Sequence, residues 1–287
     1  MTRPLTRRAP RAVAAALLLA LATALPVAVP ANAGPRLPSY DHVVVVVLEN
    51  HSRNQVLGSP DAPFLTGLAA AGVNLTRSYA VTHPSQPNYI ALFSGSTQGV
   101  TDDTCPHSFR TASLASQLLD SGRTFVGWSE GLPVAGSALC GSKLYARRHA
   151  PWTNFTNLPQ AQVGRPLTQF PTDYTRLPTV SWVIPDVCHD MHNCPVATGD
   201  AWARTQLGGY ARWALTHNSL LVVTFDEDDA SGGTNHISTV LSGAHLVPGK
   251  SGQGLDHYGL LRTIEAFYGL KPLGDAAKSR PLTGIFR

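Results

Sequence analysis

The chain alternates short runs of apolar, β-branched residues with stretches in which apolar residues recur at helical spacing. Buried strands are predicted at residues 43–48, 124–126, 179–184, 220–225 and 238–241, because apolar runs of this length suit strands that are covered on both faces. Helices are predicted at residues 63–71, 113–121, 200–216 and 260–268. This alternation predicts an α/β fold with a mainly parallel central sheet and helices on both faces.

The first residues predict export. Four arginines precede an apolar run from residue 12 to about residue 29, and Ala31-Asn32-Ala33 follows. A basic start, an apolar middle and small residues at the end are typical of a secretory signal. We therefore expect cleavage near Ala33 and a secreted single domain over residues 34–287. An N-terminal membrane anchor is the weaker interpretation, because Pro26 and Pro30 interrupt a run that is short for spanning a bilayer.

Charge and cysteine content narrow the possible partners. Without the four arginines of the leader, eighteen basic residues face eighteen acidic ones, and no basic run remains. We therefore expect no nucleic-acid partner, no stable membrane insertion and a monomer. Four cysteines in an exported chain predict two disulfides, and of three possible connectivities we favour Cys105 with Cys140 and Cys188 with Cys194. A zinc site is the alternative, although no Cys-x-x-Cys pair is present.

Acidic and amide residues follow two of the predicted strands directly. Glu49 and Asn50 come after the strand at 43–48, and Asp226 and Glu227 come after the strand at 220–225. Side chains at the carboxyl ends of neighbouring strands in an α/β sheet converge on one crevice. Because clustered carboxylates repel one another unless a cation lies among them, we predict a divalent metal site here. A solvated acidic turn is the alternative for the second segment.

Ser85 is the candidate nucleophile. It stands between Pro84 and Pro87, just before a stretch at residues 88–93 that can start a helix. The N-terminus of a helix holds phosphate well, because its free N–H groups and the helix dipole face the anion. The same place also suits a serine that only caps the helix. Beside a metal, the hydroxyl would be a metal-assisted nucleophile.

Several motifs resemble a known family. The segment Ser85-Gln86-Pro87-Asn88 resembles the nucleophile segment of the alkaline-phosphatase-like superfamily. Over nearly the whole chain after the leader, and in the same order, five motifs resemble the bacterial phosphoesterase family of secreted acid phosphatases and phospholipases C, above all its mycobacterial acid phosphatases: Glu49-Asn50, His83-Pro84-Ser85, the segment 145–149, Asp190-Met191-His192 and the segment 226–229. The resemblance implies that Ser85 attacks phosphorus and forms a phosphoserine. It also implies that Glu49, Asn50, Asp226 and Glu227 bind the metal, whose identity stays open.

The same resemblance assigns the remaining site residues. His192 is expected to contact the phosphate or to act as general acid, and His149 is expected to be catalytic. Arg147 and Arg148 are expected to grip phosphate oxygens, which planar guanidinium groups match well. Asn88 is expected to hold a phosphate oxygen. The alternatives are ordinary loop histidines, a solvated basic loop and an asparagine that caps a turn.

The number of metal ions is expected to be one. Related two-metal enzymes take an Asp and a His from the place of Asp190 and His192, but Asp226-Glu227 stands where those enzymes have an Asp-His pair. His83 points away from its neighbour Ser85 in an extended segment, so we expect it to support the site from behind. Residues 129–178, which are rich in Pro, Gly and Asn, are predicted to be loops that cap the site.

These features predict a secreted, metal-dependent phosphomonoesterase of acid-phosphatase type. Its substrates are expected to be small phosphomonoesters or lipid head groups, with phosphoinositides implied by the resemblance. A phosphodiesterase or phospholipase C is the main alternative. A serine esterase is another, since Ser129 lies in a Gly-x-Ser-x-Gly motif and Ser129, Asp226 and His257 follow the order of a hydrolase triad, but no helical segment follows Ser129. A secreted binding protein without turnover is the third.

Overall fold

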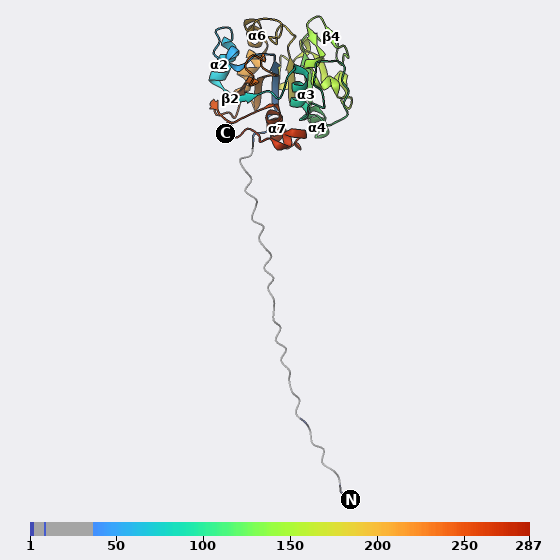
Figure 1. Cartoon of the computed structure of the whole chain (residues 1–287). Coiled ribbons are helices and arrows are strands. Elements are labelled where there is room, and N and C mark those ends of the chain that lie inside the picture. The colour runs from blue at the N-terminus through green and yellow to red at the C-terminus, as the bar shows by residue number, and fades with distance from the viewer. Residues whose placement is uncertain (3–8, 10–36) are drawn as a thin grey trace. The chain divides into compact units, whose positions relative to one another are not determined.

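Five consecutive valines at 43–47 form the middle of strand β1 (His42–Leu48), a central strand in the computed structural model, which describes residues 1, 2, 9 and 37–287. Successive side chains of a strand point to opposite faces. The odd-numbered valines therefore join one buried core and the even-numbered valines join the other. Helices cover both faces of the sheet, as the unbroken apolar run requires (Figure 1).

The eight-stranded sheet has the order β10-β2-β9-β8-β1-β7-β3-β6. Its other strands are β2 (Val73–Tyr79), β3 (Phe125–Ser129), β6 (Gly164–Pro166), β7 (Val180–Ile184), β8 (Ser219–Phe225), β9 (His236–Gly243) and β10 (Gly249–Ser251). All of these pairings are parallel except those of β9 with β8 and β2, so the predicted mainly parallel sheet is confirmed. Strand β9 is reversed because only a short loop, with no crossover helix, connects it to β8.

The helices form two layers. They are α1 (Arg53–Val56), α2 (Pro63–Ala71), α3 (Ser85–Ser94), α4 (Leu114–Asp120), α5 (Gln160–Val163), α6 (Val196–Ala214) and α7 (His257–Phe267). Residues of α3, α4 and α7 pack in one core and residues of α2 and α6 pack in the other (Figure 1). The four helices predicted from apolar spacing correspond to α2, α4, α6 and α7, with ends shifted by up to four residues.

Residues 129–178 contain only short elements, as predicted. The hairpin of β4 (Gly141–Ser142) and β5 (Tyr145–Ala146) is followed by 3-10 turns at Arg147–His149, Pro151–Asn154, Leu167–Gln169 and Tyr174–Arg176. A further 3-10 turn, Gly274–Lys278, lies near the carboxyl terminus. The disulfides Cys105–Cys140 and Cys188–Cys194 confirm the predicted pairing and leave no free cysteine for the alternative zinc site.

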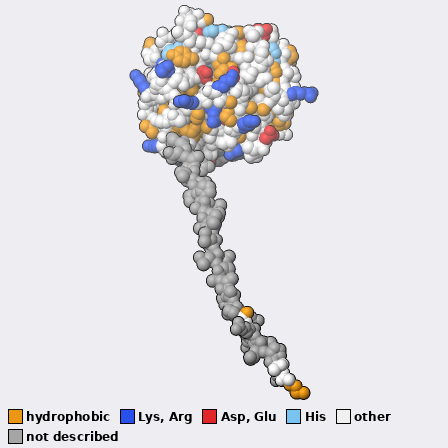
Figure 2. Space-filling model, turned by 60° about the horizontal axis from the view of Figure 1, so that its bottom comes forward, with side chains coloured by type: hydrophobic (Ala, Val, Ile, Leu, Met, Phe, Trp, Pro, Cys, Tyr) orange, Lys and Arg blue, Asp and Glu red, His pale blue; other side chains and the backbone are white. Residues whose placement is uncertain are grey.

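The predicted signal sequence and its cleavage near Ala33 fall almost entirely outside the described residues, so export stays a prediction. Residues 37–287 form one compact unit. Within the described part of the chain, no helix combines the length and the apolar character needed to cross a bilayer. Figure 2 shows Lys and Arg side chains at separate points over one face, with hydrophobic, acidic and other side chains between them. This agrees with a sequence that has no basic run.

Candidate active site

The candidate site lies at the carboxyl edge of the central strands. Strands β8, β1 and β7 are neighbours and run in the same direction, so the residues that follow them meet at one edge of the sheet. The segments that follow these strands also lie side by side, as two main-chain hydrogen bonds show. The Glu49 amide donates to the Asp190 carbonyl at 2.8 Å, and the Asp226 amide donates to the Leu48 carbonyl at 2.9 Å. These bonds fix the three acidic residues side by side.

Ser85 is buried at the first position of α3, with its hydroxyl surrounded by oxygen atoms. Its Oγ lies 2.9 Å from Oε2 of Glu49, 3.0 Å from Oε1 of Glu227 and 3.3 Å from Oδ1 of Asn50. The fold thus brings the Ser85 hydroxyl together with Glu49 and Glu227, which are far from it along the chain. Their role in catalysis stays a prediction.

Asp226 completes this group. Its Oδ1 accepts the Asn50 amide at 3.2 Å, and its Oδ2 is buried without a hydrogen-bond partner among the described residues. Asn50 adopts a left-handed backbone conformation, with φ of 48°, which asparagine tolerates better than most residues. Burial raises the pKa of Asp226 well above its usual value, and the charge of Glu227 adds to this effect.

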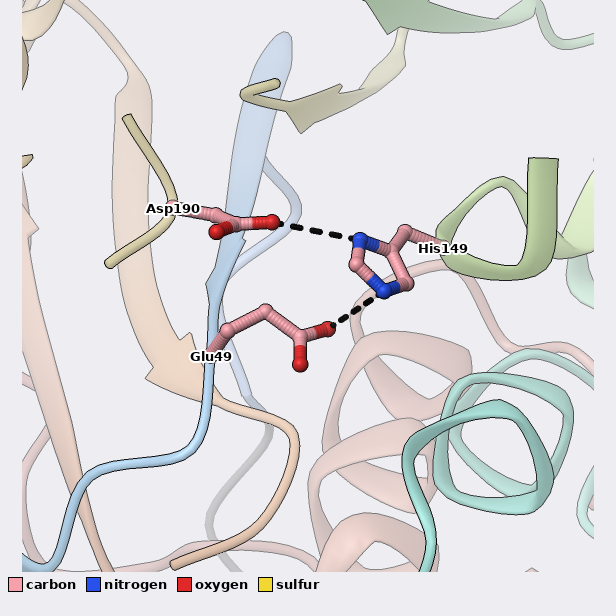
Figure 3. A group of neighbouring side chains, drawn as sticks. All are labelled: Glu49, His149 and Asp190. Atoms are coloured by element: carbon pink, nitrogen blue, oxygen red, sulfur yellow. Dashed lines mark ion pairs between the residues drawn. The ribbon is translucent and has the colours of Figure 1, made fainter. Parts of the chain in front are cut away.

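Glu49 connects Ser85 to a second group of side chains (Figure 3). Its Oε1 accepts the Tyr89 hydroxyl at 2.5 Å and lies 3.2 Å from Nε2 of His149, whose Nδ1 lies 3.2 Å from Oδ2 of Asp190. The His149 ring also stacks on Tyr89, with ring centroids 5.1 Å apart. Burial lowers the pKa of His149 well below its usual value, so the ring is neutral near pH 7.

Basic side chains of the protein do little to offset the negative charges of the carboxylates at this site. Burial raises the pKa of Glu49, with Asp226 and Asp190 contributing through their charges. Burial also raises the pKa of Glu227, and it raises the pKa of Asp190 to about 7. All four acids are buried, and Asp190 and Asp226 each have an oxygen atom without a hydrogen-bond partner among the described residues. No lysine or arginine of that part of the chain forms an ion pair with them, so they form an oxygen-rich donor set. Such a set fits a divalent cation, which relieves the repulsion.

The predicted general acid His192 lies at the rim. Its ring is exposed and its centroid is 6.2 Å from that of His149. The His192 amide donates to Oδ1 of Asp190 at 2.8 Å, and the ring Nδ1 is 2.7 Å from Oδ1 of Asn193. An exposed imidazole beside a buried acidic group is well placed to meet a substrate that enters from solvent.

Two predicted phosphate-binding residues, Asn88 on α3 and Arg147, hydrogen-bond to the protein around the site, and Asn88 Nδ2 also lies 3.5 Å from Oε2 of Glu227. The Asn88 side chain accepts the amides of Val81 and Thr82 at 3.1 and 3.0 Å, and it donates to the Thr82 carbonyl at 2.8 Å. Arg147 is buried and donates to the carbonyls of Ala138 and Thr153 at 2.7 and 2.9 Å. Both side chains therefore shape the loops around the site, and their predicted phosphate contacts stay predictions.

Arg148 is placed differently from its neighbour. Burial is the main cause of the low pKa of His149, and the charge of Arg148 adds to it; at Asp190 the same charge offsets a small part of the rise in pKa that burial causes. The Nε of Arg148 is buried without a hydrogen-bond partner among the described residues. Because Arg148 forms no ion pair with any residue that the structure describes, it is the better candidate of the two arginines for binding an anion.

Three residues that touch the site were absent from the predicted set. Asp190 was noted only as a possible ligand of a second ion, although its position two residues before His192 was a usable signal. Tyr89 lies four residues after Ser85, on the same face of α3, which is the spacing that identifies a helical neighbour. Asp103 accepts the Gln86 amide at the start of α3 at 2.8 Å, and no sequence pattern pointed to it.

His83, expected to support the site from behind, contacts two acids of the second strand end. Its Nδ1 lies 2.7 Å from Oε2 of Glu227, and its Nε2 lies 3.4 Å from Oδ1 of Asp228. The side chain is 40% exposed, so it connects Glu227 to solvent.

The geometry does not support a serine esterase. Ser129 ends β3 and is followed by turns and the β4–β5 hairpin, without the helix that a nucleophile elbow needs. Its buried Oγ has no hydrogen-bond partner among the described residues. His257 contacts the main-chain carbonyl of Asp226 through Nε2, so Ser129, Asp226 and His257 form no hydrogen-bonded triad.

Sequence comparison gives matches over most of the chain. The family model described as "Phosphoesterase family" matches residues 59–271. The phosphatidylinositol-3-phosphatase of Mycobacterium tuberculosis is 46% identical over 295 residues, which cover 100% of this chain and 97% of that protein. An acid phosphatase of Aspergillus fumigatus is 30% identical over 229 residues, which cover 72% of this chain and 51% of that protein. The chain thus spans about half the length of this fungal relative.

Solved structures share the fold at low sequence identity. A protein in the alkaline phosphatase superfamily from Vibrio parahaemolyticus has a TM-score of 0.57 at 14% identity, and the match covers 86% of this chain and 71% of that chain. The lipoteichoic acid synthase LtaP from Listeria monocytogenes has a TM-score of 0.56 at 13% identity, and the match covers 82% and 73% of the two chains. These matches confirm the predicted alkaline-phosphatase-like fold.

Proposed function

The chain belongs to the phosphoesterase family and is a hydrolase of phosphoric esters, and from this premise we propose that it is a secreted, metal-dependent phosphomonoesterase that works through a phosphoserine at residue 85. The observation that carries the proposal is the position of Ser85 Oγ, within 2.9 to 3.3 Å of Glu49, Asn50 and Glu227 at the start of a helix. A plain helix cap needs none of these acids.

Glu49, Asn50, Asp226 and Glu227 would hold the cation, since their oxygen atoms face or adjoin the Ser85 hydroxyl. When bound, a divalent cation lowers the pKa of a nearby hydroxyl and offsets the charge of a phosphate. The donor set is made of oxygen atoms, which suits hard or borderline cations. A single ion accounts for the residues around Ser85, in line with the sequence-based preference.

The first chemical step is attack of Ser85 Oγ on phosphorus. The hydroxyl proton passes to Glu227, whose other oxygen lies 2.7 Å from the half-exposed ring of His83 and thus has a path to solvent. Arg148 and the positive end of α3 face the negative phosphate. The new bond joins Oγ to phosphorus as the bond from phosphorus to the leaving oxygen breaks.

His192 protonates the leaving oxygen, because its exposed ring lies where a leaving group departs toward solvent. The same ring, now neutral, accepts a proton from the water that attacks the phosphoserine. The bond from phosphorus to Oγ then breaks, and Ser85 recovers its proton from Glu227. His149 stays neutral between Glu49 and Asp190, where it orients both acids.

The names of the relatives support the proposed substrate class. A protein with 46% identity over nearly its whole length carries the name phosphatidylinositol-3-phosphatase, and fungal matches carry the name acid phosphatase. These names support monoesters over diesters, and for this reason we include phosphoinositide head groups among the proposed substrates. The leader pattern and the two disulfides support export, since disulfides persist in oxidising compartments.

The test is hydrolysis of p-nitrophenyl phosphate by purified protein. We expect turnover that a chelator abolishes and a divalent cation restores, with Ser85→Ala at least about 10³-fold slower. Ser129→Ala is the matched control, and it should keep the parent rate. Mass spectrometry of acid-quenched protein should find phosphate on residue 85. A Ser85→Ala variant with the parent rate would overturn the assignment of the nucleophile, and faster turnover of bis(p-nitrophenyl) phosphate would favour a phosphodiesterase.

A further inference from the structure

One loop beside the candidate site exposes an unusual amount of apolar surface. Val134, Leu139 and Leu144 are 63%, 53% and 44% exposed. Within residues 37–287, only two other large apolar side chains are comparably exposed, Leu215 at 55% and Val247 at 48%. Three of the five therefore fall in a single segment of eleven residues. We call residues 131–144 the apolar loop.

The apolar loop is firmly attached to the rest of the fold. The disulfide Cys105–Cys140 anchors its second half, and the Arg147 guanidinium donates to the carbonyl of Ala138 at 2.7 Å. The Gly136 amide donates to the carbonyl of Gly164 at 2.9 Å. Because these bonds hold the backbone, the exposed side chains lack the freedom to fold back and cover themselves.

The apolar loop is also continuous with the site. The carbonyl of Leu144 accepts the Val187 amide at 3.0 Å, and Val187 lies three residues before Asp190. Along the chain, His149 follows Leu144 by five residues. Leu144 stands at the tip of the β4–β5 hairpin, after Lys143, whose φ of 54° forms the turn.

The charges around the apolar loop select the kind of partner. Residues 131–172 contain no Asp or Glu, but they contain four basic residues, of which Lys143 is exposed, Arg148 and Arg165 are partly exposed, and Arg147 is buried. Lys143 is exposed at the hairpin tip beside Leu144. Apolar side chains next to isolated basic ones suit the surface of an anionic bilayer, where the apolar groups enter the interface and the cations meet phosphate. Two copies of the loop would instead bring like charges together.

We propose that the apolar loop docks the protein on an anionic lipid surface through Val134, Leu139 and Leu144, and so presents the site to phosphate esters that are anchored in a membrane. This inference rests on the proposed function for its purpose, since docking matters only if the substrate is a lipid head group. The docking itself is a separate property that is measured without turnover.

The opposite end of the fold offers a matched control. Leu215 directly follows α6 and precedes the amino end of β8, whereas the site lies at the carboxyl end of β8. Val247 follows the end of β9, the strand that runs in the reverse direction. Both exposed side chains therefore lie at the edge of the sheet away from the site.

The experiment compares three proteins in the Ser85→Ala background, which removes turnover: the parent, the triple variant Val134→Ser/Leu139→Ser/Leu144→Ser, and the control variant Leu215→Ser/Val247→Ser. Co-sedimentation with vesicles of phosphatidylcholine and phosphatidylserine measures binding. We expect the triple variant to bind at least about tenfold more weakly than the parent and the control variant to bind as the parent does. All three proteins carry the same amino-terminal residues, so any contribution of those residues cancels in the comparison.

Activity assays separate docking from chemistry. With Ser85 intact, the triple variant should hydrolyse p-nitrophenyl phosphate at the parent rate, which would also show that the variant is folded. Its turnover of a phosphoinositide in vesicles should fall about tenfold or more. Equal vesicle binding by parent and triple variant, or an equal loss in the control variant, would overturn the docking proposal. A parent dimer that the triple mutation dissociates would overturn it in favour of self-association. A parent that binds vesicles but hydrolyses no phosphomonoester would overturn the proposed function and leave the docking intact.

Discussion

Glu49 shows how one buried side chain connects the parts of the candidate site. One of its oxygens faces the Ser85 hydroxyl at 2.9 Å, and the other receives the Tyr89 hydroxyl and faces His149. The carboxylate is fully buried, so water cannot replace any of these partners. We therefore expect a change at this single residue to disturb both the proposed nucleophile Ser85 and the His149–Asp190 pair.

Glu265, remote from the site on α7, has a titration that affects stability. It is buried, its Oε1 accepts the Leu273 amide at 2.8 Å, and its Oε2 has no partner among the described residues. Burial raises its pKa to about 7 from 4.5. A raised pKa means that the folded state binds the proton more tightly than the unfolded state. The contribution is therefore present below pH 4.5 and is lost as the pH rises through about 7.

We expect Glu265→Gln, which mimics the protonated acid, to be as stable as the parent near pH 4 and more stable by up to about 3 kcal/mol near pH 8. Urea unfolding at a series of pH values measures the difference. The exposed Asp61 provides the control, and Asp61→Asn should follow the parent at every pH. A constant difference between Glu265→Gln and the parent across this range would show that the acid does not titrate there.

At the scale of elements, a pair of glycines positions the loop that carries His149. Gly127 of β3 and Gly164 of β6 are partners in the parallel register, and the indole of buried Trp152 lies over both. A Cβ at either glycine would overlap the indole. Trp152 follows His149 by three residues. The distance between the indole and strands β3 and β6 therefore determines where the turn that carries His149 lies.

We predict that Gly127→Ala costs about 1–3 kcal/mol of stability through overpacking and also lowers turnover of phosphomonoesters, because Trp152 must move. Gly67→Ala is the matched control. Gly67 lies on the exposed side of α2 with no atom near its missing Cβ, so alanine there should add about 0.5–1 kcal/mol. Thermal unfolding and steady-state rates measure both effects. Equal melting temperatures for the two variants would refute the role of the glycine pair.

Patterns along the sequence predicted some elements much better than others. The valine run of β1 and the apolar run of β8 were correctly predicted as buried strands, because a strand that is covered on both faces needs no polar positions. Strand β2 (Val73–Tyr79) was missed, since its sequence VNLTRSY mixes polar residues into a strand near the edge of the sheet. The direction of β9 was also missed, because strand direction depends on the connection and not on the composition of the strand.

At the scale of the whole molecule, the site is assembled from segments that begin near residues 49, 85, 149, 190 and 226. Four buried carboxylates with raised pKa values destabilise the fold when they are ionised together. The proposed cation, when bound among them, would therefore stabilise the folded protein.

We expect a chelator to lower the melting temperature by about 5–10 °C, since a ligand at a hundred times its Kd contributes about 2.7 kcal/mol. Differential scanning calorimetry with and without restored cation measures the shift. Glu49→Gln/Asp226→Asn should abolish the shift. Glu130→Gln should retain it, although Glu130, Asp186 and His189 form another acid and histidine group with spacing that suits a metal. A shift that depends on Glu130 instead would place the cation at that group.

The sequence by itself determined the local features of this protein: the buried strands, the main helices, the acids at two strand ends and the serine at a helix start. These follow from periodicity and residue chemistry, which act over a few neighbouring positions. Only the tertiary structure decided which groups share one site, because the parallel order β8-β1-β7 is what places Asp226, Glu49 and Asp190 side by side. It also decided that the polar atoms of Asn88 and Arg147 bond to other parts of the protein, since hydrogen-bond partners depend on contacts that no spacing along the chain records.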